Sequence, residues 1–234
     1  MAESTAFEAN EALSDSAYRE AVIDLLGVIS YGEMSAFERL AEDAKLAPSL
    51  QDKLALGMMA SVQLTKVAAL HKRIADLGAD PFESMSPFQV ALDSFHRHTA
   101  PSDWLEGLVK AFVGDGLAND FYREIAVFLD PQTRDLVLSA LDDDGGHASF
   151  VVDRVCGLIA ADPPIGGRLA LWGRRLMGEA LTQAQRVAAD RDSLTALLTG
   201  SVDRPGLDLA ALGRMFTRLT DRHLERMGEL GLAG

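Results

Sequence analysis

The stretch that decides the fold is residues 22–40, which reads VIDLLGVISYGEMSAFERL. Its apolar residues recur three and four positions apart, as on the face of an α-helix that packs against a core, and predict a first helix of about 25 residues. One carboxylate, Glu33, lies on this apolar face with Ile29, Ala36 and Phe37. A carboxylate in such a position is either buried with a partner or binds a metal.

The same helical spacing continues along most of the chain, and no run alternates with the period of two that a strand would show. The pattern predicts further helices over about 50–77, 86–98, 102–129, 131 onwards with a break at Gly145-Gly146, 166–198 and 208–230. Capping residues and prolines support several of these starts, namely Ser49, the capping box Ser86-Pro87-Phe88-Gln89, Asp103 and Asp130-Pro131. Long helices with short links predict an all-α, up-and-down bundle.

Composition limits the domain organisation and the compartment. Residues 1–16 are small and acidic and predict a disordered tail, followed by a single helical domain over 17–234. The formal charge of -13 argues against DNA as a partner. The single cysteine, Cys156, suits a reducing cytosol. No basic, apolar leader and no apolar run of about 20 residues is evident, so we expect a cytoplasmic protein with no membrane segment.

Candidate site residues are polar side chains inside apolar helical stretches. Besides Glu33, Asp115 lies between two glycines in such a stretch, and Asp144 and His147 stand at i and i+3 on one helical face. These four are candidate metal ligands, and the alternative is a metal-free, hydrogen-bonded core. Motifs of nucleophilic or nucleotide-dependent enzymes are absent from the sequence, so no catalytic residue is assigned.

Four stretches carry a resemblance to a known family: Leu25–Glu33, Trp104–Ala111, Gly114–Tyr122 and Leu171–Leu176. Over about residues 17–231 the chain resembles the actinobacterial ferritin-like proteins and is similar to the MiaE-like tRNA hydroxylases, which act on methylthio-isopentenyladenosine. The resemblance implies a ferritin-like four-helix bundle with additional C-terminal helices. It also implies a di-iron site, with Glu33 as the ligand of the first helix, Asp115 of the third, and Asp144 with His147 of the fourth.

The second helix departs from this pattern. Where the family places Glu-x-x-His, the chain has Gln63 and Lys66. Glutamine is a neutral ligand, and a lysine ammonium cannot ligate a metal. We therefore interpret Lys66 as replacing the metal's charge in a buried polar network. Glu179 and Gln183, at i and i+4 on a later helix, are candidates for supporting contacts.

Two functions follow from this site. In the first, the protein has a degenerate di-iron site, reduced or absent catalysis, and an interaction or scaffold role, with a possible homodimer through its helices. Its cofactor would then be none or a single iron or manganese ion. In the second, it is an active iron- and oxygen-dependent hydroxylase of a modified tRNA base, with two irons and tRNA as partner. Arginines at positions 168, 174, 175, 186 and 191 could face that tRNA, or could pair with the chain's own acids.

Overall fold

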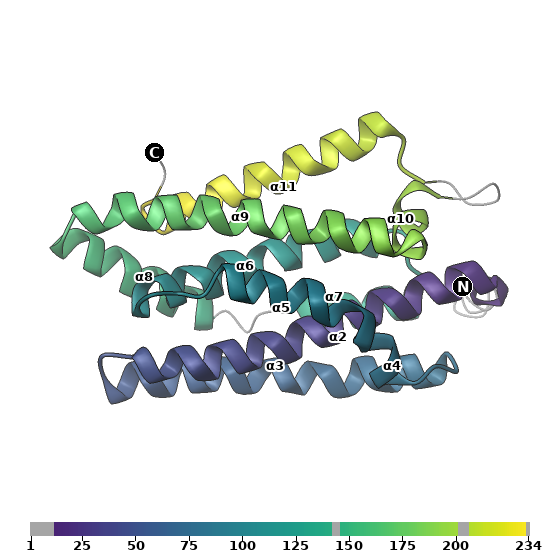
Figure 1. The fold of residues 1–234 in the computed structure, drawn as a ribbon, viewed down its shortest axis with the longest axis horizontal. Helices are drawn as coiled ribbons and strands as arrows, with labels where there is room; N and C mark the ends of the chain where they lie inside the picture. Colours follow the sequence, from purple (N-terminus) through teal and green to yellow (C-terminus); the bar gives the residue numbers. More distant parts are fainter. Residues whose placement is uncertain (1–11, 142–145, 201–205, 233–234) are drawn as a thin grey trace.

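The computed structural model describes residues 12–141, 146–200 and 206–232, and for residues 146 and 147 the helical backbone alone. Within these ranges the chain is almost entirely helical and has no strand. Figure 1 shows long helices running side by side, with α2 and α3 at one edge of the molecule and α9 and α11 at the other. The prediction of an all-α bundle with additional C-terminal helices is confirmed.

The helical pair α2 and α3 forms one half of the bundle. Helix α2 covers Ser16–Asp43 and begins at Asp15, whose carboxylate accepts hydrogen bonds from the first-turn amides. A short 3-10 turn, Ala44–Leu46, leads to α3, which covers Leu50–Asp76 and is capped by Ser49 as expected. The two helices run side by side and pack against each other. Most of the predicted 1–16 tail lies outside the described residues, but Ala12 and Leu13 pack on the α2 core.

The other half is built on α6. Helix α6, Trp104–Ala126, is buried on almost every side in its first half and contacts α9, α11, α8 and α7. Helices α7, Pro131–Leu141, and α8, Gly146–Ala161, follow one another in the place of a fourth long helix. The predicted break at Gly145-Gly146 falls between them, and residues 142–145 are outside the described residues.

Two predicted boundaries were wrong. Ser86 is not an N-cap, because helix α4, Pro81–Met85, already begins at Asp80, which caps it through its carboxylate. A 3-10 turn, Ser86–Phe88, then leads into α5, Gln89–His98. The predicted helix over 166–198 is two helices, α9, Pro164–Asp190, and α10, Asp192–Thr199, because Arg191 leaves the helical backbone conformation. Arg191 and Ser193 both contact Asp24 of α2, which fastens this corner to the bundle.

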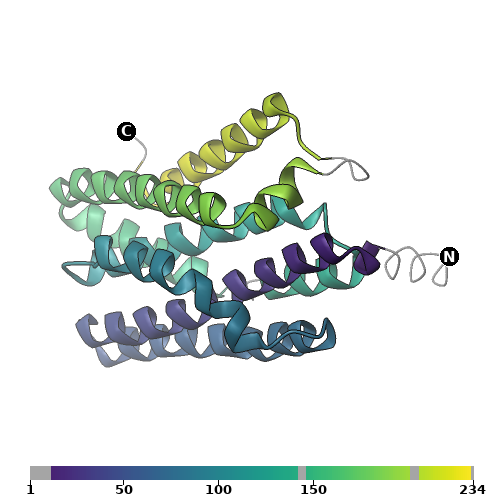
Figure 2. The ribbon, with the colours of Figure 1, turned by 45° about the vertical axis from the view of Figure 1, so that its right-hand side comes forward.

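The last helix, α11, covers Leu209–Glu229 and is capped by Asp208. Figure 2 shows that α11 is inclined to α9: its C-terminal end lies close to that helix and its N-terminal end lies away from it. Its arginines pair with α6: Arg226 with Asp120, and Arg218 with Glu124. These pairs fix α11 on α6.

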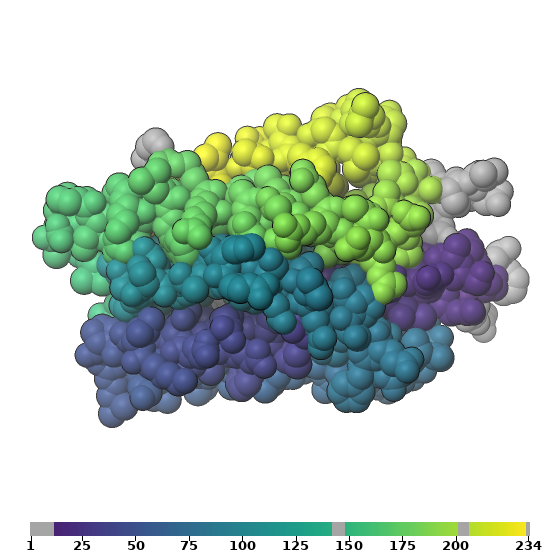
Figure 3. Space-filling view, in the orientation of Figure 1, coloured from purple at the N-terminus to yellow at the C-terminus, as the bar shows by residue number. Residues whose placement is uncertain are grey.

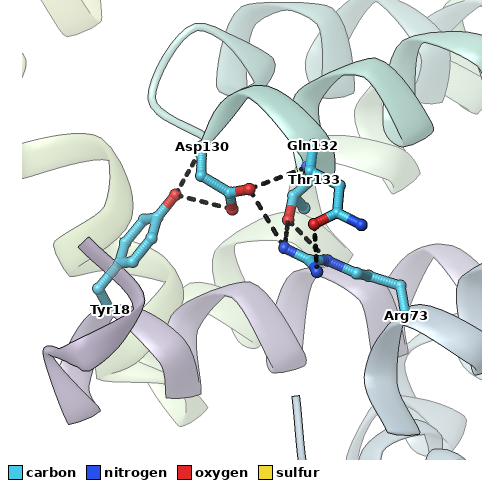
Figure 4. A network of polar contacts seen from close by, with 5 residues as sticks. All are labelled: Tyr18, Arg73, Asp130, Gln132 and Thr133. Atoms are coloured by element: carbon cyan, nitrogen blue, oxygen red, sulfur yellow. Dashed lines mark hydrogen bonds and ion pairs between the residues drawn. The ribbon is translucent and has the colours of Figure 1, made fainter. Parts of the chain in front are cut away.

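A fully partnered polar network joins α2, α3 and α7 (Figure 4). The guanidinium of Arg73 lies 3.2 Å from the carboxylate of Asp130 and also donates to Gln132 and Thr133. The hydroxyl of Tyr18 completes the network at Asp130. Because every charged group in it has a partner, we interpret this network as structural.

Helix α3 is long and apolar enough to cross a membrane by length and composition alone, which the sequence analysis did not anticipate. In the structure it lies against α2, and its inner face carries Asp52, Gln63 and Arg73, all buried. Its outer face exposes the apolar residues Leu50, Leu54 and Met58.

Candidate functional site: a lysine-centred network beside an apolar cavity

Three helices bring four of the predicted site residues together. Glu33 enters from α2, Gln63 and Lys66 from α3, and Asp115 from α6. The ammonium of Lys66 lies 3.6 Å from a carboxylate oxygen of Glu33 and donates a 3.1 Å hydrogen bond to the amide oxygen of Gln63. The amide nitrogen of Gln63 in turn donates to Asp115 at 3.4 Å. Gln63 and Lys66 are three residues apart, so one helix face presents both.

Burial dominates the electrostatics of this network. Glu33 is 9% exposed, and the loss of water raises the pKa of its carboxyl to about 7. Lys66 opposes this rise through its positive charge, and Asp115 adds to it. Burial and the charge of Glu33 also raise the pKa of Tyr122, which keeps its phenol protonated. Near neutral pH the carboxyl of Glu33 is therefore present in both its protonated and its ionised form.

The residues of the network do not fit a two-metal site. A di-iron bundle needs carboxylates and imidazoles on its four core helices, and here the α3 positions hold a neutral amide and an ammonium. Among the residues that the structure describes, no three His, Cys, Asp or Glu side chains gather as a metal site requires. Asp144 lies outside the described residues, as does the side chain of His147, so the predicted fourth-helix ligands are not placed.

The predicted supporting residues occupy different places. Gln183 of α9 is buried and lines the same cavity as Lys66. Glu179 instead accepts hydrogen bonds from Gln183 and from His98 of α5, at 2.7 and 2.9 Å. Neither has a hydrogen bond to the network around Lys66 in the described part of the chain.

The network forms part of the wall of a cavity of about 420 Å³ inside the bundle. Its other walls are mainly aliphatic and aromatic side chains of α2, α5, α6, α9 and α10. On the face shown in Figure 3, α5 lies between α2 and α9, and it contacts both. The volume is within the range of small-molecule binding pockets, about 300–1,000 Å³.

A second polar group lies in the same cavity and was missed by the sequence analysis. It consists of Lys110 of α6, His96 of α5 and Asp43 of α2. The signal that could have found it is the lysine inside the apolar run 108–113, LVKAFV, which has no polar face for a charge to occupy. His96 carried no such signal, because its helix is short and rich in polar residues.

Taken together, the paired long helices and the carboxylates that meet between them define a ferritin-like bundle. The comparison with known families agrees: residues 16–201 match the family described as the ferritin-like domain of actinomycetes, and the chain belongs to it. The resemblance to ferritin-like proteins is thereby confirmed. No curated protein sequence matches the chain.

Proposed function

We propose that this chain is a ferritin-like protein that works without a di-iron centre, and that Lys66 supplies the charge which a metal would otherwise bring. The observation that carries the proposal is the position of the Lys66 ammonium, 3.6 Å from Glu33 and hydrogen-bonded to Gln63. The protein would then act by binding, as an interaction or carrier protein, and not by activating oxygen.

The physical argument concerns charge and donor type. A divalent ion between Glu33 and Asp115 would stand next to a fixed ammonium, and like charges a few ångströms apart in a buried site repel strongly. Gln63 offers at most one neutral oxygen, and that oxygen already accepts from Lys66. Both α3 positions therefore disfavour a metal in the described part of the site.

The runner-up is an iron- and oxygen-dependent hydroxylase of a modified tRNA base. The similarity to the MiaE-like hydroxylases and the i, i+3 spacing of Asp144 and His147 support it. Two of the predicted arginines, Arg168 of α9 and Arg191 just after it, do not. Arg168 pairs with Asp103 and Glu106, and Arg191 pairs with Asp24, so these charges are partly used within the protein.

Metal content tests the proposal directly. We expect protein expressed with iron and manganese supplied to contain almost no metal per chain, as measured by plasma mass spectrometry. About two irons per chain would overturn the proposal in favour of the hydroxylase. About one metal would also overturn it, and would point to a reduced site on Glu33, Asp144 and His147.

A designed variant tests the role of the α3 positions. The double substitution Gln63→Glu and Lys66→His restores the Glu-x-x-His pattern and should create iron binding where the wild type has little. Lys72→His is the matched control, since Lys72 is an exposed lysine on the same helix that pairs with Asp76. A folded double variant with unchanged metal content would show that these positions do not decide metal binding.

A further inference from the structure

Lys110 is a buried ammonium that attracts the carboxylate of Asp43 but forms no ion pair with it in the described part of the chain. It is 5% exposed, and its Nζ donates one hydrogen bond, 2.8 Å long, to the carbonyl oxygen of Thr99. It also lies 5.6 Å from the centre of the Phe95 ring. Within the described residues no carboxylate comes within the 4.0 Å of an ion pair. An ammonium has three N–H donors, so two remain for a ligand.

His96 presents a second unused polar group at the same end of the cavity. Its Nδ1 is fully buried and has no hydrogen-bond partner. Burial, together with the charges of Lys110 and Arg39, lowers the pKa of the ring to about 3, so the imidazole is neutral. A neutral imidazole can take the tautomer that donates from this nitrogen. Buried groups of this kind are rarely left without partners in native proteins.

The cavity that both groups line is long and apolar. On α2 alone its wall runs from Leu25 to Asp43, which is about 27 Å at the rise of an α-helix. Between these ends the wall is mainly apolar, with Val28, Ile29 and Leu92, and the paired Glu33 and Lys66 lie midway along it; at the far end it includes Leu194 and Leu198. A polar end and a long hydrocarbon wall are the features of a site for a single-chain amphiphile.

We propose that this cavity binds one long-chain carboxylate, a fatty acid, with its head group on Lys110 and His96 and its acyl chain along α2. The proposal goes beyond the proposed function, because it depends on the Lys110 end of the cavity and not on whether metal binds at Glu33.

The charges select an anion. Three carboxylates and three cations line the cavity: Glu33, Asp43 and Asp115 against Arg39, Lys66 and Lys110. Lys66 is paired with Glu33, and Arg39 with Glu42. Asp43 attracts Lys110, but among the described residues no carboxylate forms an ion pair with this ammonium, so its donors can still take a ligand carboxylate. A carboxylate would complete an ion pair there, in a setting where burial makes the pair selective. A cationic amphiphile would be repelled at the same point.

The test is binding of palmitate to the full-length, delipidated protein, followed by displacement of a fluorescent fatty acid. We expect saturable binding at one site per chain. Lys110→Met, which keeps the length and apolar character of the side chain, should weaken palmitate binding at least tenfold and leave binding of 1-hexadecanol unchanged, because the alcohol has the same chain without the charge. Lys72→Met is the matched surface control and should change neither.

A second variant keeps the proposal testable if Lys110→Met does not fold. Ala184→Phe adds a large side chain to the α9 wall of the cavity and should abolish binding of both palmitate and hexadecanol. No palmitate binding by the wild type would overturn the proposal, as would equal losses of acid and alcohol in Lys110→Met. Metal analysis is independent of these results, so the two proposals can fail separately.

Discussion

Lys66 shows how one residue changes the chemistry available to a fold. Polar residues in apolar stretches marked Glu33 and Asp115 as candidates, and the resemblance to the ferritin-like family added Gln63 and Lys66 as the residues at the second-helix positions of the same site. The structure brings these four together. Spacing could not predict Lys110 and His96, because their common environment arises only when α5 closes over α2 and α6.

Removing the ammonium of Lys66 should destabilise the protein in a pH-dependent way. Because the raised pKa of Glu33 keeps it largely protonated below pH 7, Lys66→Met should cost little at pH 6. At pH 8 the wild-type carboxylate is ionised, whereas without its cation the buried carboxyl must stay protonated, and we expect a loss of about 1.4 kcal/mol in the free energy of unfolding relative to wild type. Urea denaturation at both pH values measures this.

The double variant Glu33→Gln with Lys66→Met is the control for that experiment. It removes both charges, so most of the loss at pH 8 should disappear. If the difference in stability between wild type and the single variant were the same at pH 6 and pH 8, Lys66 would not be the partner of an ionised Glu33.

His96 should make the protein sensitive to acid. Its pKa is lowered in the folded state, so its contribution to stability is full above about pH 6.5 and is lost as the pH falls toward 3. Between pH 7 and pH 5 the free energy of unfolding should fall by about 2 kcal/mol through this residue. Glu33 acts in the opposite sense over this range, so the measurement is the difference between wild type and His96→Gln at each pH. A difference that stays constant with pH would contradict it.

At the scale of elements, the starts of three helices were predicted correctly, whereas the start at Ser86 and the break at Arg191 were not. Ser49, Asp103 and Pro131 open helices as expected, because a cap acts through local hydrogen bonds. The break at Arg191 has a different origin. It depends on the contacts of that corner with Asp24, and no local sequence signal encodes a partner 167 residues away.

The docking of α11 depends on a glycine of α6. A Cβ at Gly116 would collide with the guanidinium and stem of Arg226, the residue that pairs with Asp120. Gly116→Ala should therefore move the Arg226 side chain away from Asp120 and destabilise the protein by about 1 kcal/mol, although alanine favours helices. Gly178→Ala on α9, where nothing lies within 4 Å, is the control and should be neutral or stabilising. Thermal unfolding of both variants measures the difference in stability. A Gly116→Ala protein as stable as the control would show that the contact of Arg226 with α6 does not hold α11 in place.

At the scale of the whole molecule, the class of fold followed from the sequence because helical periodicity and short links leave few arrangements. The cavity could not be predicted in this way. Its length along α2 and its closure by α5 depend on how helices from distant parts of the chain settle against each other. The placement of the charges could not be predicted from the sequence either. A formal charge of -13 does not reveal that three cations line one mainly apolar cavity.

Lys66 also has a consequence for how the folded protein depends on its surroundings. The positive charge at the centre of the bundle is joined to the chain by covalent bonds, so a chelator cannot extract it and a cell starved of iron cannot withhold it. A metalloprotein loses its central cations under such conditions, whereas this bundle retains the ammonium of Lys66.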